Sequence, residues 1–425
     1  MAKKIQPRLI YADLEGNIFD HPHLLMLCRK GADIAPPSPQ DLIPLPPESE
    51  LFLLPQRNAL GFDPESGQIE ALEQPALAAF VSPGHTLTGL SAFLSEESSP
   101  RLPLFAYGAV GYAKGRFWVC ARKVDRDRRQ QFSAIPQARI EEGAQRWLKA
   151  FPDNRLVRHL TRCALTSCCP AARNLALGRF EAPLPTARGC NAACVGCISE
   201  QPPDSGFPAT QSRIAFRPSA REITEIMHRH AASEKRPIFS FGQGCEGEPL
   251  LESDTIRAAV AGYRARSGRG TVNINTNASR PESLPGLAQA GLDAIRVSLN
   301  SARDAIYHPY YRPRDYSLGT VASSVAQAKE LGLFVSLNLL FFPGISDTES
   351  ELHALSELIA KTRLDFIQLR NLNLDPELYL ELLPEQGSPS MGLANFMARL
   401  QNAFPWIAFG YFNPYVASGE KETQA

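Results

Sequence analysis

From about residue 179 onward, runs typical of buried β-strands alternate with runs typical of amphipathic helices. Strands separated by helices of this length pair in parallel, because the chain must cross back over the sheet before the next strand begins. The predicted strands are 180–184, 237–241, 272–276, 294–299, 334–340, 366–370 and 406–411. The predicted helices are 220–232, 254–265, 320–331, 348–361 and 391–403. This alternation predicts an α/β fold with a TIM-like (βα) barrel, partial or complete.

The N-terminal third has a different pattern, in which short apolar runs are broken by proline and glycine. Strands are predicted at 8–12 and 51–54, and a hairpin around 111–115 is predicted to join strands at 104–107 and 116–120. We therefore predict four regions. They are a mostly β accessory domain at 1–136, a helical connector at 137–178, the barrel at 179–415 and a disordered tail at 416–425.

Charge and hydropathy exclude two classes of protein. The 425 residues contain 44 Lys and Arg and 44 Asp and Glu, so the formal net charge is zero, which argues against nucleic acid as the main partner. No apolar run approaches the roughly 20 residues that span a bilayer, so no membrane segment is predicted. The first eight residues contain two lysines without an apolar run behind them, unlike a secretory signal, and we expect a cytoplasmic protein.

Nine cysteines are present, and six of them fall into two tight groups. In the second group, Cys190, Cys194 and Cys197 are separated by three and then two residues, directly after the first predicted barrel strand. Thiolates are soft ligands that favour zinc or iron–sulfur clusters. A closed zinc site would need a fourth ligand nearby, whereas three ligands suit a cubane with one open iron. A zinc loop and three unrelated thiols remain the alternatives on spacing alone.

This cysteine pattern, placed after the first strand of a βα barrel, resembles that of the radical S-adenosylmethionine (radical SAM) superfamily. The resemblance implies a [4Fe–4S] cluster on Cys190, Cys194 and Cys197 whose open iron binds S-adenosyl-L-methionine. It also implies reductive cleavage of that cofactor to a 5′-deoxyadenosyl radical, which abstracts hydrogen from a substrate. One residue departs from the family pattern, because Gly196 stands where an aromatic residue usually precedes the last cysteine.

A second motif follows the second predicted strand. Gly247, Glu248 and Pro249 resemble the superfamily's Gly-Gly-Glu-Pro element, which contacts the amino group of the cofactor, but Glu246 replaces the first glycine. The resemblance implies that polar residues on the next strands bind the cofactor's carboxylate and ribose. The candidates are Asn275, Asn277, Ser298, Asn300 and Asn338. For each of them, a polar side chain satisfied by neighbouring backbone is an equal alternative.

Three further features leave alternatives open. Residues 307–314, rich in tyrosine and arginine, are predicted to be a loop that either binds an aromatic or anionic substrate or packs on the accessory domain. The first cysteine group, Cys163, Cys168 and Cys169, suggests either a second cluster or buried structural thiols. Cys245 is likewise either near the active site or an ordinary buried thiol.

The predicted function is a radical SAM enzyme acting on a peptide or a small molecule, reduced by a donor such as flavodoxin or ferredoxin. No catalytic residue is assigned from the sequence. The alternatives are a non-catalytic iron–sulfur or zinc protein and an activase that installs a glycyl radical on a partner protein. The large N-terminal region argues against the activase.

Overall fold

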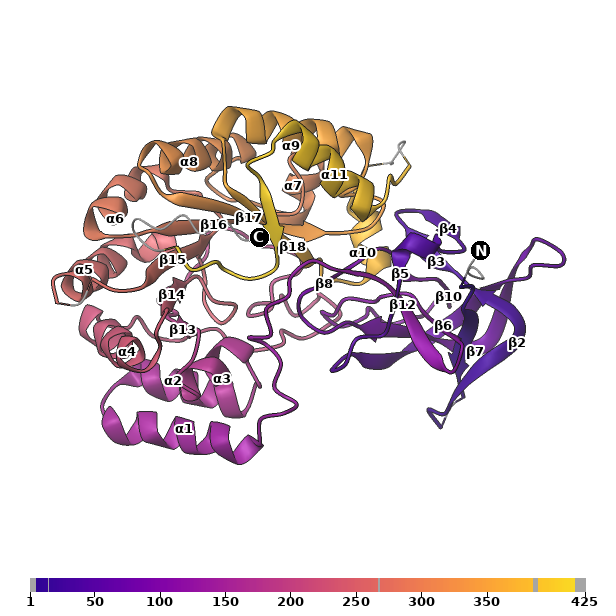
Figure 1. The fold of residues 1–425 in the computed structure, drawn as a ribbon, viewed down its shortest axis with the longest axis horizontal. Coiled ribbons are helices and arrows are strands. Elements are labelled where there is room, and N and C mark those ends of the chain that lie inside the picture. The colour runs from indigo at the N-terminus through magenta and orange to yellow at the C-terminus, as the bar shows by residue number, and fades with distance from the viewer. Residues whose placement is uncertain (1–4, 14, 267, 385–388, 417–425) are drawn as a thin grey trace.

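The computed structural model describes residues 5–13, 15–266, 268–384 and 389–416. A β-rich domain formed by the N-terminal segment stands beside an α/β barrel, and three helices join the two (Figure 1). The order and type of these parts confirm the fold class predicted from the sequence.

The N-terminal domain is built on antiparallel pairing, as its proline- and glycine-broken pattern predicts. Its larger sheet contains β1 (Arg8–Ala12), β2 (Ile18–Met26), β5 (Leu42–Pro44), β6 (Glu50–Phe62), β7 (Ile69–Phe80), β8 (His85–Leu87), β10 (Phe93–Ser95), β11 (Val110–Ala113) and β12 (Arg116–Lys123). A smaller sheet contains β3 (Cys28–Lys30), β4 (Asp33–Ala35) and β9 (Leu90–Ser91).

The predicted hairpin exists, but its first strand was placed too early in the chain. The strands β11 and β12 pair antiparallel around Lys114 and Gly115, which both have positive φ, as a tight hairpin turn requires. Residues 104–107 form no strand. Instead, the amide of Phe105 and the hydroxyl of Tyr107 both donate to the carbonyl of Pro103, which folds this apolar run into a turn.

The connector consists of three helices, α1 (Gln137–Ala150), α2 (Arg155–Leu165) and α3 (Pro170–Ala176). Asn154 caps α2, because its side chain accepts a hydrogen bond from the amide of Val157 at 3.0 Å. The indole of Trp147 on α1 donates to the carbonyl of Leu175 on α3 at 2.9 Å. The cap thus sets the start of α2, and the indole hydrogen bond ties α1 to α3.

The barrel sheet has seven parallel strands in chain order: β13 (Glu181–Pro183), β14 (Ile238–Phe241), β15 (Thr271–Thr276), β16 (Ala294–Leu299), β17 (Phe334–Phe341), β18 (Phe366–Asn371) and β19 (Ala408–Gly410). The helices are α4 (Ala220–Ser233), α5 (Ser253–Arg264), α6 (Leu284–Ala290), α7 (Asp304–Tyr311), α8 (Leu318–Glu330), α9 (Glu349–Thr362), α10 (Pro376–Glu381) and α11 (Leu393–Ala403). They cover the outer face of the curved sheet (Figure 1). Among the described strands, β13 and β19 do not pair with each other, so the barrel is partial.

One side chain bridges the gap in this barrel. The amide nitrogen of Asn413, just after β19, donates to Glu181 of β13 at 2.9 Å, and its oxygen accepts from Gln368 of β18 at 3.0 Å. The carboxylate of Asp125, in the linker that leaves the N-terminal domain, accepts from the amide of Tyr411 at 2.9 Å. The interdomain linker and the C-terminal segment thus meet at the barrel opening.

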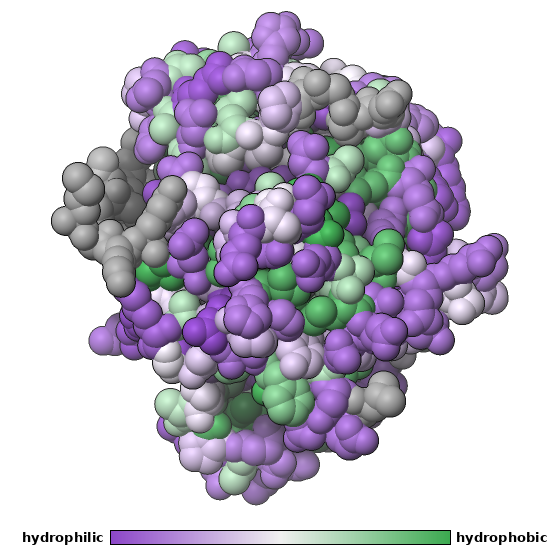
Figure 2. All heavy atoms as spheres, turned by 90° about the vertical axis from the view of Figure 1, so that its right-hand side faces the viewer, coloured by the Kyte–Doolittle hydropathy of each residue, from purple (hydrophilic) through white to green (hydrophobic). Residues whose placement is uncertain are grey.

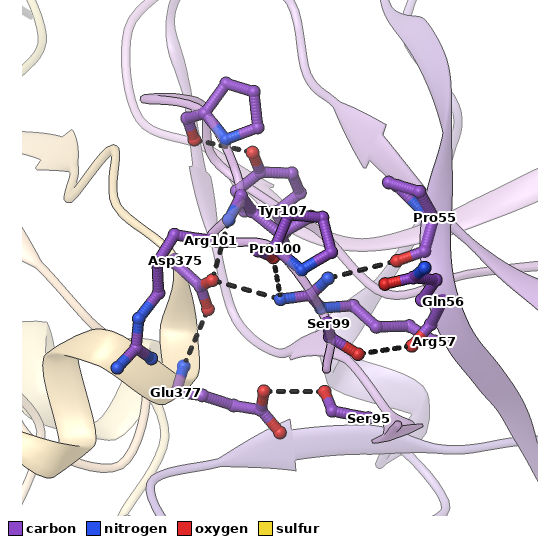
Figure 3. A network of polar contacts seen from close by, with 12 residues as sticks. Pro55, Gln56, Arg57, Ser95, Ser99, Pro100, Arg101, Tyr107, Asp375 and Glu377 are labelled. Atoms are coloured by element: carbon purple, nitrogen blue, oxygen red, sulfur yellow. Dashed lines mark hydrogen bonds and ion pairs between the residues drawn. The ribbon is translucent and has the colours of Figure 1, made fainter. Parts of the chain in front are cut away.

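The N-terminal domain docks against the carboxyl ends of β17 and β18, where the sites of βα barrels lie. The hydroxyl of Thr86 donates to the carbonyl of Leu369 at 2.7 Å, and the amide of Leu87 donates to the side chain of Asn371 at 2.8 Å. Figure 3 shows a second contact, in which Arg57 of the β domain reaches Asp375 at the start of α10. The two domains are therefore joined by buried polar contacts beside the mouth of the barrel.

The outer face of the N-terminal domain carries apolar side chains. Figure 2, which looks onto this side of the molecule, shows hydrophobic residues gathered in the middle of the face with hydrophilic residues around them. In the part of the chain that the structure describes, no helix has the length and apolar character of a membrane span. The domain limits stay predictions, and the predicted tail lies outside the described residues except for Val416.

Candidate functional site

The cysteine loop leaves β13 and is fastened to the loop that follows β14. The amide of Gly247 donates to the carbonyl of Ala187 at 2.8 Å, and the amide of Glu248 donates to the carbonyl of Gly189 at 2.9 Å. A Cβ atom at position 247 would collide with that same carbonyl of Gly189, so glycine is needed here. The two motifs that lie about 50 residues apart in the sequence are one structural unit.

Glu246, which departs from the family motif, strengthens this unit. One of its carboxylate oxygens accepts from the amides of Thr186 and Ala187 at 2.7 and 2.9 Å, and the other accepts from the amide of Gln243 at 2.7 Å. Burial raises the pKa of this carboxyl to about 7, and the same backbone hydrogen bonds oppose that rise. The residue therefore holds the start of the cysteine loop on the second motif.

The thiols of Cys190, Cys194 and Cys197 are free and belong to partly exposed residues. Burial, followed by the nearby carboxylate of Glu248, raises the pKa of Cys190 to about 11. Burial and the two other thiols raise the pKa of Cys194 as well. The Arg213 guanidinium donates to the sulfur of Cys197 at 3.4 Å. The three sulfurs thus share one site beside Glu248, with a cation hydrogen-bonded to one of them.

The spacing of these sulfurs bears on the kind of metal centre. Among the described residues, only one set of three His, Cys, Asp or Glu ligand atoms lies within 4.8 Å of one another, and it does not include Cys190, Cys194 and Cys197. Ligands of a single tetrahedral ion must lie closer together than ligands of a cubane, because each cubane thiolate binds a different iron. At least one pair of these three sulfurs therefore lies more than 4.8 Å apart, which is wider than a single zinc ion holds two thiolates.

Gly196, the other departure from the family pattern, faces a tyrosine. A Cβ atom at position 196 would lie 2.5 Å from the hydroxyl of Tyr310. Tyr310 belongs to α7 and is 4% exposed, and its carbonyl accepts from the amide of Val195 at 2.9 Å. Residues 307–311 were predicted to lie in a loop. In the structure they are helical, and they pack on the cysteine loop.

Glu248 is buried, and three protein groups donate to its carboxylate. They are the amide of Asn277 at 2.8 Å, the amide of Leu250 at 3.0 Å and the hydroxyl of Thr276. Burial raises the pKa of Glu248 to about 7 in spite of these hydrogen bonds. A carboxylate offers about four lone-pair directions, so one remains for a further donor such as an ammonium group.

The five predicted cofactor residues have three kinds of surroundings in the structure. Asn275 and Asn277 have side chains engaged with protein: Asn275 donates to the carbonyl of Phe241 at 2.9 Å, and Asn277 donates to Asn191 in the cysteine loop at 2.9 Å. Asn300 and Asn338 each carry a buried amide oxygen without a partner among the described residues. Ser298 is partly exposed and pairs in register with Asn338 on the next strand.

The inner face of the barrel is polar and positively charged. The guanidinium of Arg296 on β16 donates to Gln368 at 3.2 Å, and its buried Nε has no partner among the described residues. Burial, with Arg370 as the second cause, lowers the pKa of Arg296 to about 10. Sequence reasoning missed Arg296, although a polar residue inside an otherwise apolar parallel strand was a usable signal.

Comparison with known proteins decides the family. The model of the Radical SAM superfamily matches residues 184–355, a range that contains the cysteine loop, the Glu248 motif and β14 to β17. Residues 184–355 of this chain form a radical SAM domain. The resemblance inferred from Cys190, Cys194 and Cys197 is confirmed at the level of the superfamily, and the chain is a member of a family of enzymes.

The curated relatives of this radical SAM chain are distant. It is 28% identical over 202 residues to "Molybdenum cofactor biosynthesis protein 1" of Bos taurus, covering 47% of this chain and 28% of that protein. It is 29% identical over 161 residues to "Probable GTP 3′,8-cyclase" of Methanocella arvoryzae, covering 38% and 47%. The chain thus spans less than half the length of these relatives. A solved radical SAM methyltransferase from Sphaerobacter thermophilus has 15% identity and a TM-score of 0.38, covering 55% of this chain and 67% of that one.

The family implies a [4Fe–4S] cluster and S-adenosylmethionine, and the residues present fit both. Three free thiols whose sulfurs do not all lie within 4.8 Å of one another suit the cluster. The unpartnered oxygens of Asn300 and Asn338 and the open direction of Glu248 are polar groups that a bound cofactor could satisfy.

Proposed function

We propose that this protein holds a [4Fe–4S] cluster through Cys190, Cys194 and Cys197, reductively cleaves S-adenosylmethionine and abstracts hydrogen from an anionic substrate. The observation that carries this proposal is the joined unit of the two loops. It presents three free thiols beside the buried carboxylate of Glu248. When bound, the cluster supplies the electron that breaks the carbon–sulfur bond of the cofactor.

The residues of the chain bind and orient these groups. The thiols lose their protons when they bind iron, because the thiolate is the ligand form. Arg213 donates a hydrogen bond to the sulfur of Cys197, which stabilises negative charge on that ligand. Glu248, kept in place by Asn277 and Thr276, accepts a hydrogen bond from the cofactor's ammonium group.

The substrate class follows from the inner face of the barrel. The charge of Arg370 is near enough to Arg296 to lower its pKa, which Glu181 partly opposes, and the Nε of Arg296 lacks a partner among the described residues. A carboxylate or phosphate between them would relieve the repulsion and complete the hydrogen bonds. Because two relatives carry names that include GTP cyclisation or molybdenum cofactor biosynthesis, GTP is the first anionic compound to test.

Substrate size is limited by the N-terminal domain. Its contacts to Leu369 and Asn371 place it beside the mouth of the barrel. This placement favours a small molecule or an extended peptide over a folded protein, and it argues against the activase alternative. A reduced flavodoxin or ferredoxin remains the proposed electron donor.

The test is anaerobic reconstitution of the full chain with iron and sulfide, followed by reduction in the presence of S-adenosylmethionine. We expect 5′-deoxyadenosine by mass spectrometry and a changed electron paramagnetic resonance spectrum of the reduced cluster when the cofactor is added. Cys194→Ala should lose both signals, whereas the matched control Cys168→Ala, at an exposed cysteine, should keep them. Two results would contradict the proposal. One is zinc in place of iron on the three cysteines, and the other is a cluster whose electron paramagnetic resonance spectrum does not change when the cofactor is added.

A further inference from the structure

A second group of potential metal ligands lies outside the cysteine loop. His159 and Cys163 are four residues apart on α2, so both project from one face of the helix. Cys245 comes from the loop after β14 and meets them. The ligand atoms of these three residues all lie within 4.8 Å of one another, and the residues are 5%, 5% and 3% exposed.

Two sulfurs converge on a single nitrogen in this group. The Nε2 atom of His159 lies 3.4 Å from the sulfur of Cys245 and 3.5 Å from the sulfur of Cys163. A neutral ring nitrogen has one in-plane direction, either a donor or an acceptor, so it cannot make a good hydrogen bond to both sulfurs at once. A metal ion between the three atoms would bind all of them.

The distances also fit one ion. In tetrahedral zinc, with Zn–N of about 2.0–2.1 Å and Zn–S of about 2.3 Å, a nitrogen and a sulfur ligand stand about 3.6 Å apart. The two observed separations are within about 0.2 Å of that value. The nitrogen and thiolate donor set suits zinc, and the spacing is tighter than at the cysteine loop.

A further cysteine lies on the same connector. Cys169 packs against the apolar cluster that contains Cys163 and Cys245, and its amide donates to the carbonyl of Cys163 at 3.1 Å, but its sulfur is not among the ligand atoms that lie within 4.8 Å of one another. The neighbouring Cys168 is exposed and has a positive φ of 51°, so its side chain belongs to the solvent side of the turn. The adjacent pair therefore divides into one inward and one outward cysteine.

We propose that His159, Cys163 and Cys245 hold a structural zinc ion, whose fourth position is open to Cys169 once its side chain turns toward the other three ligands. The ion fastens the helical connector to the loop that carries Glu246 and Glu248, because Cys245 directly precedes Glu246. Two elements far apart in the sequence, α2 and the loop after β14, then share one cross-link. This zinc is independent of the cluster and of the proposed reaction.

The experiment uses the full chain with Cys190, Cys194 and Cys197 all changed to alanine, so that no cluster forms at the first site. After chelator treatment and gel filtration, mass spectrometry of metals should find about one zinc per chain. Adding Cys163→Ser or Cys245→Ser should lower this content at least about fivefold, because the thiolates supply most of the zinc affinity. Adding Cys168→Ser, the matched control, should leave it unchanged.

A second measurement does not depend on the folding of these variants. Replacement of zinc by Co²⁺ in the three-alanine chain should give intense visible bands of tetrahedral cobalt and thiolate-to-cobalt charge transfer in the near ultraviolet. Absence of zinc together with absence of these bands overturns the proposal. Zinc that persists in both the Cys163→Ser and the Cys245→Ser chains overturns it as well. Neither result bears on 5′-deoxyadenosine formation by the wild type.

Discussion

Arg57 and Asp375 form a buried ion pair between the two domains, and its removal should destabilise the whole protein. The two side chains are 2% and 0% exposed, and their N···O distance is 3.2 Å. Asp375 also accepts from the amides of Leu102 at 2.8 Å and Glu377 at 3.0 Å. The substitution Asp375→Asn keeps the shape but removes the charge and one acceptor oxygen (Figure 3).

The size of the expected loss in unfolding free energy follows from the burial of this ion pair. At 3.2 Å and an effective dielectric constant of about 20, the attraction between two unit charges is about 5 kcal/mol. In the variant, Arg57 stays a buried cation whose remaining partners are the carbonyls of Pro55 at 3.0 Å and Pro100 at 2.8 Å. Breaking one side of a buried pair costs about 3–5 kcal/mol, and we expect Asp375→Asn to lower the free energy of unfolding by that amount.

The assay is urea-induced unfolding of the metal-free chain at pH 7, with a double-mutant cycle. Replacing both residues, as Arg57→Met with Asp375→Asn, removes the orphaned charge and should cost at least about 2 kcal/mol less than Asp375→Asn alone. The comparison across the same interface is Glu381→Gln, because the Arg101–Glu381 pair is 37% and 56% exposed and should contribute at most about 1 kcal/mol. Equal losses of unfolding free energy in Asp375→Asn and Glu381→Gln would refute the claim that the buried pair contributes more than the exposed one.

Three further predictions concern the site and the connector. Glu246→Gln replaces an acceptor for three backbone amides and should reduce the iron retained after reconstitution, measured per chain against Cys168→Ala. Pyrophosphate should raise the melting temperature of the wild type. Arg296→Met should abolish this rise, whereas the exposed Arg116→Met should keep it, and equal rises in both variants would contradict a cationic barrel interior. The Arg155 side chain lowers the pKa of Glu222 to about 2 from the usual 4.5, so the pair stabilises the fold above about pH 4.5 and loses this effect as pH falls towards 2. Glu222→Gln should therefore cost about 1–2 kcal/mol in unfolding at pH 7 and almost nothing near pH 2, and a pH-independent difference would be the contrary result.

The barrel was predictable from the sequence because its strands are buried on both faces. Runs such as 294–299, in which apolar residues outnumber Arg296 and Ser298, stand out from the polar helices around them, and each predicted barrel strand corresponds to an observed one. The short helices α6, α7 and α10 were missed, since each contains a proline and has at most eight residues, too few for a helical period to appear.

The interdomain contacts could not be predicted, because no local pattern encodes them. Thr86 and Leu369 are 283 residues apart, and Arg57 and Asp375 are 318 apart. Each of these residues is ordinary in its own segment. Asp375 caps the short helix α10, and its second role exists only because the β domain brings Arg57 to it. The same holds for His159, which becomes a candidate ligand only beside Cys245.

The two departures from the family motifs have a common physical explanation in the packing of the cysteine loop. From the sequence, Gly196 appears as the loss of an aromatic residue and Glu246 as the loss of a glycine. In the structure, the hydroxyl of Tyr310 occupies the space that a side chain at 196 would need. The carboxylate of Glu246 binds two amides at the start of the same loop. An aromatic side chain at 196 would therefore require the displacement of Tyr310, so these positions must be judged together with their partners and not one at a time.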